Sequence, residues 1–168
     1  MVDDLTQALR SLRLAVFDFD GVFTDNRVWV SERGEEWVAC CRADGLGLRR
    51  LAQAGVACVI VTSEEVPVAS VRARKLGVEC VQGATDKLVV VEEQAARRGV
   101  SLEETAYVGN DVNDADCLRA VGMPVVPADA WPEVRPLALW VLSRRGGWGC
   151  VREFCDAVWR ARQAEGRG

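Results

Sequence analysis

The chain has 168 residues, of which 25 are acidic and 21 basic, so its net charge is −4, and it contains no histidine. The acidic balance disfavours a nonspecific nucleic-acid binder or a binder of anionic membranes, and the lack of histidine excludes Ser-His-Asp triads and histidine-ligated metal sites. No apolar run approaches the roughly 18 residues of a membrane span, and the first residues do not resemble a secretory signal. We therefore expect a cytoplasmic protein with a single domain over residues 1–168.

Hydrophobic periodicity and turn signals predict helices that alternate with strands. In chain order, the predicted elements are a helix over 1–12, a strand over 14–17, a β-hairpin over 27–41, a helix over 45–54, a strand over 56–61, a helix over 67–76, a strand over 78–81, a helix over 86–98, a strand over 105–108, a helix over 113–121, strands over 123–126 and 139–142, and a helix over 149–163. Asp44 is the expected N-cap of the helix over 45–54, and Leu46, Leu48 and Leu51 its expected inner side.

The predicted strands are continuously apolar, as in a sheet whose two faces are both covered. Together with the alternating helices, this predicts an α/β fold with a doubly wound, Rossmann-like parallel sheet and a small hairpin insertion after the first strand. Ligands of such folds bind beyond the carboxyl ends of the strands. The seven cysteines include no Cys-x-x-Cys pair and mostly lie in apolar runs, which favours buried free thiols over disulfides or zinc sites.

Two aspartates follow the first strand, at positions 18 and 20. Carboxylates held this close repel each other unless a positive group lies between them, and Mg²⁺ prefers such oxygen ligands. The alternative is an ordinary strand that ends in an Asp/Gly-rich turn. Polar residues also follow two other strands, and the parallel topology brings all of them to one edge of the sheet. They are Thr62, Ser63, Asn110, Asp111 and Asp114, with Lys87 at the start of the intervening helix.

These residues resemble the four motifs of the haloacid dehalogenase-like phosphatases, in order and over nearly the whole chain. The matching segments are Asp18-Phe-Asp20-Gly-Val-Phe-Thr24, Val61-Thr62-Ser63, Asp86-Lys87 and Tyr107-Val-Gly-Asn110-Asp111-Val-Asn-Asp114. Asp44-Gly45 and the segment from Arg145 to Glu153 resemble one group of that superfamily, which lacks a cap domain and acts on phosphorylated ulosonic acids. The group includes nonulosonate 9-phosphate phosphatases, 3-deoxy-manno-octulosonate 8-phosphate phosphatases and the phosphatase-like domain of some acylneuraminate cytidylyltransferases.

The resemblance implies a Mg²⁺-dependent phosphomonoesterase. Asp18 is the implied nucleophile, which forms an aspartyl phosphate, and Asp20 is the implied general acid and base. Thr62 would hydrogen-bond the transferring phosphoryl group, and Lys87 would neutralise its charge. The alternative for Lys87 is a solvated lysine in the first helical turn.

The implied metal ligands are Asp18, the backbone carbonyl of Asp20, and Asn110 or Asp111. The family usually has an acidic residue directly after the glycine of its last motif, and here that residue is Asn110. An asparagine oxygen still ligates a hard cation, but with one negative charge fewer. Asp111 could replace it directly or through water.

The expected substrate contacts are Ser63, Glu64, Arg72, Lys75 and Arg145. Glu64 and Lys75 resemble the substrate-selecting pair of nonulosonate 9-phosphate phosphatases, so a sialic-acid-type 9-phosphate is the favoured substrate and the octulosonate 8-phosphate the alternative. Arg145 is expected to pair with a substrate carboxylate. The alternatives are a solvated basic helix face for Arg72 and Lys75 and a basic surface turn for Arg145.

The group is also implied to form homotetramers in which the hairpins build a central barrel and the C-terminal segment reaches a neighbour's site. Trp29 and Trp37 on so short a hairpin would be costly to leave in water, which independently favours an interface. Two other hypotheses remain open. One is a non-catalytic oligomerisation domain associated with an acylneuraminate cytidylyltransferase, and the other is a receiver-like switch, against which the Asp-x-Asp-Gly-x-x-Thr pattern argues.

Overall fold

The computed structural model describes residues 2–165. Within them, six parallel strands form one sheet in the order β5-β4-β1-β6-β7-β8. The strands are β1 (Leu14–Phe17), β4 (Ala57–Val61), β5 (Glu79–Val81), β6 (Thr105–Val108), β7 (Met123–Val126) and β8 (Trp140–Val141). The chain winds from β1 outward to β5 and then returns to β6 on the other side of β1. The carboxyl end of β1 is therefore the point at which the winding direction changes, where such sheets bind ligands.

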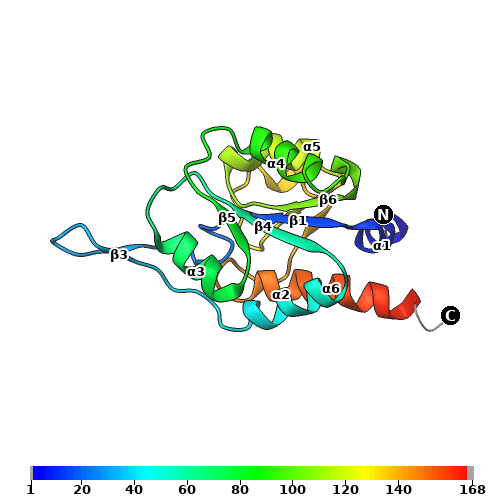
Figure 1. Cartoon of the computed structure of the whole chain (residues 1–168), viewed down its shortest axis with the longest axis horizontal. Helices are drawn as coiled ribbons and strands as arrows, with labels where there is room; N and C mark the ends of the chain where they lie inside the picture. Colours follow the sequence, from blue (N-terminus) through cyan, green and yellow to red (C-terminus); the bar gives the residue numbers. More distant parts are fainter. Residues whose placement is uncertain (1, 166–168) are drawn as a thin grey trace.

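Helices cover both faces of this sheet (Figure 1). One face carries α4 (Lys87–Ala96) and α5 (Ala115–Ala120), and the other carries α2 (Asp44–Gln53), α3 (Val68–Leu76) and α6 (Cys150–Glu165), against which α1 (Val2–Ser11) packs. Short 3₁₀ turns, η1 (Leu102–Glu104), η2 (Val112–Asp114) and η3 (Arg135–Leu137), lie in the connections. The predicted doubly wound α/β fold is confirmed.

The two faces of β1 explain why its sequence is apolar throughout. Ala15 and Phe17 belong to the core beneath α2 and α6, whereas Leu14 and Val16 belong to the core beneath α4 and α5. All four residues are fully buried, because side chains alternate across a strand and both sides are covered.

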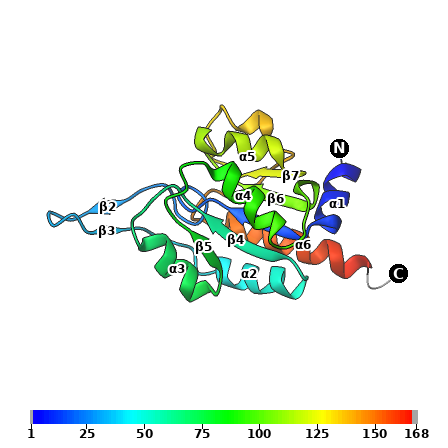
Figure 2. The ribbon, with the colours of Figure 1, turned by 45° about the horizontal axis from the view of Figure 1, so that its top comes forward.

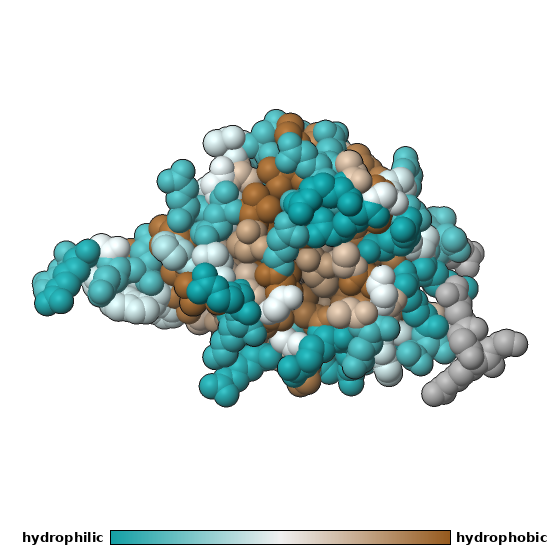
Figure 3. Space-filling view, in the orientation of Figure 1, coloured by the Kyte–Doolittle hydropathy of each residue, from teal (hydrophilic) through white to brown (hydrophobic). Residues whose placement is uncertain are grey.

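The predicted hairpin consists of β2 (Trp29–Val30) and β3 (Glu36–Trp37), which pair antiparallel. It projects well beyond the rest of the molecule (Figures 1 and 2). Trp29 lies opposite Trp37, and these two side chains are 55% and 53% exposed. In the space-filling view the hairpin is pale and hydrophilic over most of its length, and hydrophobic residues gather where it joins the body (Figure 3).

The predicted capping of α2 is wrong. Ala43 occupies its N-cap, and the Asp44 carboxylate instead accepts a hydrogen bond from the backbone N–H of Arg152, at 3.1 Å, in the first turn of α6. The residue before α6 is Gly149, which has no side chain to cap the helix, so a residue about a hundred positions away does so. Leu46 is also misassigned, since it is 50% exposed, whereas Leu48 and Leu51 are buried as predicted.

Helix α4 ends at Ala96, two residues before the predicted boundary. Each of the seven cysteines is a free thiol, as predicted, but only Cys117, Cys150 and Cys155 are buried. Among the described residues, no helix combines the length and apolarity that crossing a bilayer requires.

Candidate active site

The polar residues predicted to meet at one edge of the sheet do so. All of them except the buried Asp114 line a cleft of about 160 Å³ at the carboxyl ends of β1, β4 and β6. The lining residues are Asp18, Asp20, Asn26, Thr62, Ser63, Glu64, Lys87, Asn110, Asp111 and Asn113. Sequence reasoning missed Asn26 and Asn113. Asn26 has a positive φ of 62°, a conformation that asparagine tolerates better than most residues, and its place beside Asp25 after the Asp-Gly loop was an available turn signal.

Asp18 and Lys87 form a buried ion pair in this cleft. The Lys87 Nζ atom lies 3.0 Å from Asp18 Oδ1 and 2.8 Å from Asp114 Oδ1. The backbone N–H of Phe19 donates a further hydrogen bond to Asp18 Oδ1, at 2.7 Å. Asp86 caps α4 through the Val89 N–H, which fixes the start of the helix that carries Lys87. A cation at a helix N-terminus opposes the helix dipole, and here the two carboxylates hold it in place.

Asp114 is a structural hub rather than a free metal ligand. It is fully buried and accepts four hydrogen bonds, from Lys87, from the hydroxyl of Tyr107 and from the backbone N–H groups of Asn110 and Asp111. Both carboxylate oxygens are thereby occupied. The residue fixes the loop after β6 and holds Lys87 toward Asp18.

Burial raises the pKa of Asp18 to about 7, and the charge of Asp114 adds to this effect while Lys87 opposes it. For Lys87, burial acts to lower the pKa, but Asp18 and Asp114 outweigh it and the pKa is raised above its ordinary value. An ionised Asp18 is therefore costly in the protein alone. A bound cation at this edge would favour the ionised form.

Asp20 is held by a different set of contacts. The Thr24 hydroxyl donates a hydrogen bond to Asp20 Oδ1 at 3.2 Å and accepts hydrogen bonds from the N–H groups of Gly21 and Asn26. Burial raises the pKa of Asp20, the hydrogen bond from Thr24 lowers it, and the charge of Glu64 raises it. A carboxyl group whose pKa is raised is suited to hold and return a proton.

The donor set suits a hard divalent cation. Asp18 and Asn110 contribute oxygen-bearing side chains from two neighbouring strand ends, and the Asn110 side chain lies directly over Gly21, where a Cβ atom would come within 2.0 Å of it. Asp111 already accepts a hydrogen bond from the N–H of Val112. In the described chain, no group of three acidic or cysteine side chains is close enough to hold a metal ion alone. Such a set fits Mg²⁺, which commonly takes one or two carboxylates and completes its shell with water and phosphate oxygens.

The C-terminal glycines support the catalytic loop from behind. The N–H of Gly147 donates to the carbonyl of Val22 at 3.0 Å, and the Cys150 thiol donates to the same carbonyl. A Cβ atom at Gly146 would lie 1.9 Å from the carbonyl oxygen of Gly21. Only a chain without side chains at this point can pack so closely against the loop that follows Asp18 and Asp20.

Three predicted substrate contacts do not reach the cleft within one chain. Arg72 and Lys75 line a separate groove of about 660 Å³ between the hairpin and α3. The Arg72 guanidinium donates a hydrogen bond to the backbone carbonyl of Cys41. Arg145 is exposed and lines none of these clefts. Glu64 and Lys75, which are expected to contact the substrate together, therefore lie in different clefts within one chain, whereas Ser63 and Glu64 both line the catalytic cleft.

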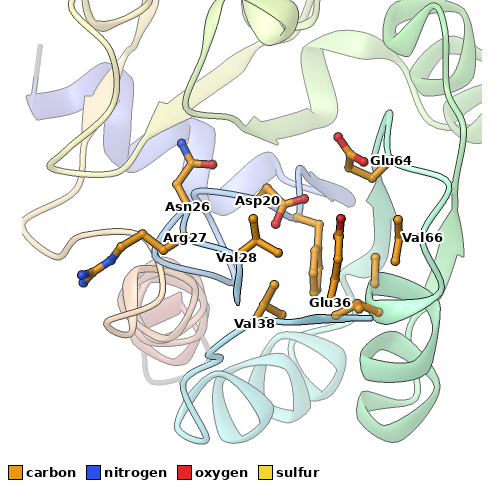
Figure 4. A pocket seen from close by; sticks show the side chains of 11 residues that line it. Asp20, Asn26, Arg27, Val28, Glu36, Val38, Glu64 and Val66 are labelled. Carbon is orange, nitrogen blue, oxygen red and sulfur yellow. The ribbon is translucent and has the colours of Figure 1, made fainter. Parts of the chain in front are cut away.

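A second cavity of about 240 Å³ adjoins the cleft and shares Asp20, Asn26 and Glu64 with it (Figure 4). The hairpin contributes Glu36 and Val38 to its wall. The hairpin thus forms part of the catalytic surroundings as well as a projection from the body.

No family model matches the chain. The curated relatives and the solved structures, however, agree on one family. The chain is 36% identical over 159 residues to 3-deoxy-D-manno-octulosonate 8-phosphate phosphatase of Yersinia pestis, covering 94% of this chain and 85% of that protein.

Solved structures indicate the same family. The crystal structure of the Yersinia pestis phosphatase superposes with a TM-score of 0.92 over 96% of this chain and 88% of that chain. A hydrolase of Legionella pneumophila, of haloacid dehalogenase subfamily III A, is 30% identical with a TM-score of 0.93, over 96% and 90% of the two chains. The 3-deoxy-D-manno-octulosonate 8-phosphate phosphatase of Moraxella catarrhalis, in complex with magnesium, phosphate and the sugar acid, is 27% identical with a TM-score of 0.94, over 99% and 97%.

Proposed function

Because this chain belongs to the haloacid dehalogenase-like phosphatases and, among them, to the family of 3-deoxy-D-manno-octulosonate 8-phosphate phosphatases, we propose that it hydrolyses this sugar phosphate at the cleft around Asp18. The observation that carries the proposal is the buried contact of Asp18 with Lys87 beside Asp20 and Thr62. Asp18, Lys87 and Asp20 thereby supply a nucleophile, a fixed positive charge and a proton carrier at one edge of the sheet.

The residues divide the reaction into two steps. An Asp18 oxygen attacks the phosphorus while the bond to the sugar oxygen breaks, and Asp20 gives its proton to that oxygen. Asp20 then takes a proton from water, which attacks the phosphorus and releases phosphate and the free Asp18 carboxylate. Lys87 and Thr62 stabilise the charge on the phosphoryl oxygens in both steps.

The magnesium of the Moraxella catarrhalis structure suggests the cofactor of this chain as well. Asp18, the backbone carbonyl of Asp20, Asn110 and Asp111 are the groups that would hold Mg²⁺. The ion would offset the repulsion between the phosphate and the carboxylates and keep Asp18 ionised.

A nonulosonate 9-phosphate is the second candidate substrate. Glu64, one member of the expected selecting pair, lines the cleft, but Lys75 lies in the other groove, and the curated relatives favour the eight-carbon substrate. Steady-state kinetics with both sugar phosphates and 4-nitrophenyl phosphate test the proposal. We expect Mg²⁺-dependent turnover, the highest kcat/KM for the octulosonate, and loss of at least about a thousandfold in Asp18→Asn. The proposal would be contradicted if the protein hydrolysed none of the three phosphates. A preference for the nine-carbon substrate would reverse the choice of sugar.

We also propose that the protein forms a homotetramer through its hairpins. The cross-strand pair of half-exposed tryptophans, together with Val28 and Val30, supports this proposal. Size-exclusion chromatography with light scattering measures the assembly directly. Association with a cytidylyltransferase stays a prediction, for which copurification is the test.

A further inference from the structure

The cavity beside the catalytic cleft has an unusual distribution of charge. The carboxylates of Asp20, Glu36 and Glu64 converge on it from three different segments of the chain, and Val28, Val38 and Val66 lie around them (Figure 4). Its apolar lining comes from Phe19, Val28, Val38, Val66, Val68 and Ala69. The cavity is thus acidic at its opening toward the scissile bond and apolar along its walls.

The basic residue in the lining does not compensate for this acidity. The Arg27 guanidinium points away from the centre of the cavity (Figure 4) and is held by Asp25, with its Nε and Nη2 atoms 3.1 Å and 3.0 Å from Asp25 Oδ2. A second anionic group would therefore be repelled from this space. Hydroxyl groups would be attracted, because ionised carboxylates are strong hydrogen-bond acceptors.

Glu36 and Glu64 both have carboxylates without a hydrogen-bond partner among the described residues, and Glu36 is the one that the hairpin contributes. It is half-buried on β3, between the exposed Glu35 and Trp37, because alternate residues of a strand face opposite sides. Its carboxylate makes no hydrogen bond or ion pair with any residue that the structure describes. Within one chain, the partner that remains for it in the cavity is a bound molecule or water.

We propose that this cavity binds the polyhydroxylated carbon chain of the leaving group, and that Glu36 accepts hydrogen bonds from its hydroxyls and thereby selects a polyol leaving group. The inference rests on the proposed function and refines it. The carboxylate of an ulosonate lies at the opposite end of the carbon chain from a terminal phosphate, so the substrate can place its hydroxyls beside Glu36 and leave its carboxylate outside. The hairpin then acts as a specificity element for its own active site.

The experiment compares Glu36→Ala with Glu35→Ala, which removes the neighbouring exposed glutamate on the same hairpin. For each variant, kcat/KM is measured with 3-deoxy-D-manno-octulosonate 8-phosphate and with 4-nitrophenyl phosphate, which has no aliphatic hydroxyl. The free sugar acid is then tested as an inhibitor of 4-nitrophenyl phosphate turnover, so that binding is measured without the protonation step.

In Glu36→Ala we expect kcat/KM for the sugar phosphate to fall about tenfold or more, the loss typical of a hydrogen bond to a charged group. The inhibition constant of the sugar acid should rise by a similar factor. Turnover of the aryl phosphate should stay within about twofold, which also reports an intact fold. Glu36→Gln, which keeps an acceptor oxygen, should lose less, and Glu35→Ala should match the wild type.

Two results would overturn the inference while leaving the phosphatase activity in place. One is an unchanged inhibition constant in Glu36→Ala, and the other is an equal loss with both phosphates. Wild-type protein that hydrolyses neither phosphate would instead contradict the proposed function, and this inference with it.

Discussion

At the scale of single residues, Asp114 holds the residues around the cleft in place although it does not line the cleft itself. It holds Lys87, Tyr107 and the backbone of the loop after β6 at once. Removing one member of a buried charged network leaves its partners desolvated and unpaired, which costs more than the interaction itself contributes.

Asp114→Ala should therefore reduce the free energy of unfolding by about 3–5 kcal/mol. Urea unfolding measures this change. Asp116→Ala is the matched control, because Asp116 is exposed and pairs only with Arg119, so its loss should stay within about 0.5 kcal/mol. Equal losses in the two variants would show that Asp114 does not hold the loop.

A second prediction at this scale concerns Asn110. Replacing it with aspartate adds one negative charge to the group of oxygens around Asp18, and the affinity of a cation site increases with the charge of its ligands. In Asn110→Asp, the Mg²⁺ concentration that gives half-maximal phosphatase activity should fall about tenfold. Titration of activity with Mg²⁺ provides the measurement. An unchanged midpoint would place Asn110 outside the metal shell.

At the scale of elements, the start of α6 depends on a residue of α2. Asp44 caps α6, and burial raises its pKa to about 6 from an ordinary value of 3.8, against the opposing hydrogen bond from the Arg152 N–H. Between pH 4 and 6, roughly, the folded protein binds more protons at Asp44 than the unfolded chain does. Its contribution to the free energy of unfolding therefore falls as pH rises through this window and stays low above it.

Asp44→Asn should remove that dependence, since asparagine still caps a helix but does not ionise. The stability of the variant relative to the wild type should rise between pH 4 and pH 7, by at most about 3 kcal/mol. Urea unfolding of both proteins across this range is the measurement. Parallel stability curves would contradict the assignment of the titration to Asp44.

The capping of α6 also marks where sequence reasoning stops. Strands β1 and β6 could be predicted to the residue because burial on both faces makes them continuously apolar between polar turns. The capping of α6 by Asp44 could not be predicted, because Arg152 is distant from Asp44 in sequence and local capping rules consider only the helix that follows a residue. The site likewise combines residues that could be predicted from the sequence with contacts that could not. Asp18 and Thr62 directly follow strands and Asp20 lies in the turn after β1, so these residues could be placed. The contacts of Asp114 and the hydrogen bond of Arg72 to Cys41 arise from tertiary packing.

At the scale of the whole molecule, the projecting hairpin allows the proposed assembly to be tested separately from folding. Its tryptophans lie outside both buried cores, so a charge placed there should disrupt subunit contacts and leave the domain folded. In Trp37→Glu we expect a smaller species by size-exclusion chromatography with light scattering and unchanged far-UV circular dichroism. Arg33→Glu, in the exposed turn of the hairpin, is the control. Assembly of Trp37→Glu identical to the wild type would argue against an interface at this face.

The contact of Gly146 and Gly147 with the loop after β1 has a consequence for the order in which the enzyme becomes competent during synthesis. All the residues proposed for phosphoryl transfer are present by Asp111. The loop that carries Asp18 and Asp20 contacts its support only when residues 146–150 have been added. A nascent chain that ends before residue 146 holds every residue proposed for phosphoryl transfer but lacks the packing that supports the loop of Asp18 and Asp20, so the site is completed only after those residues.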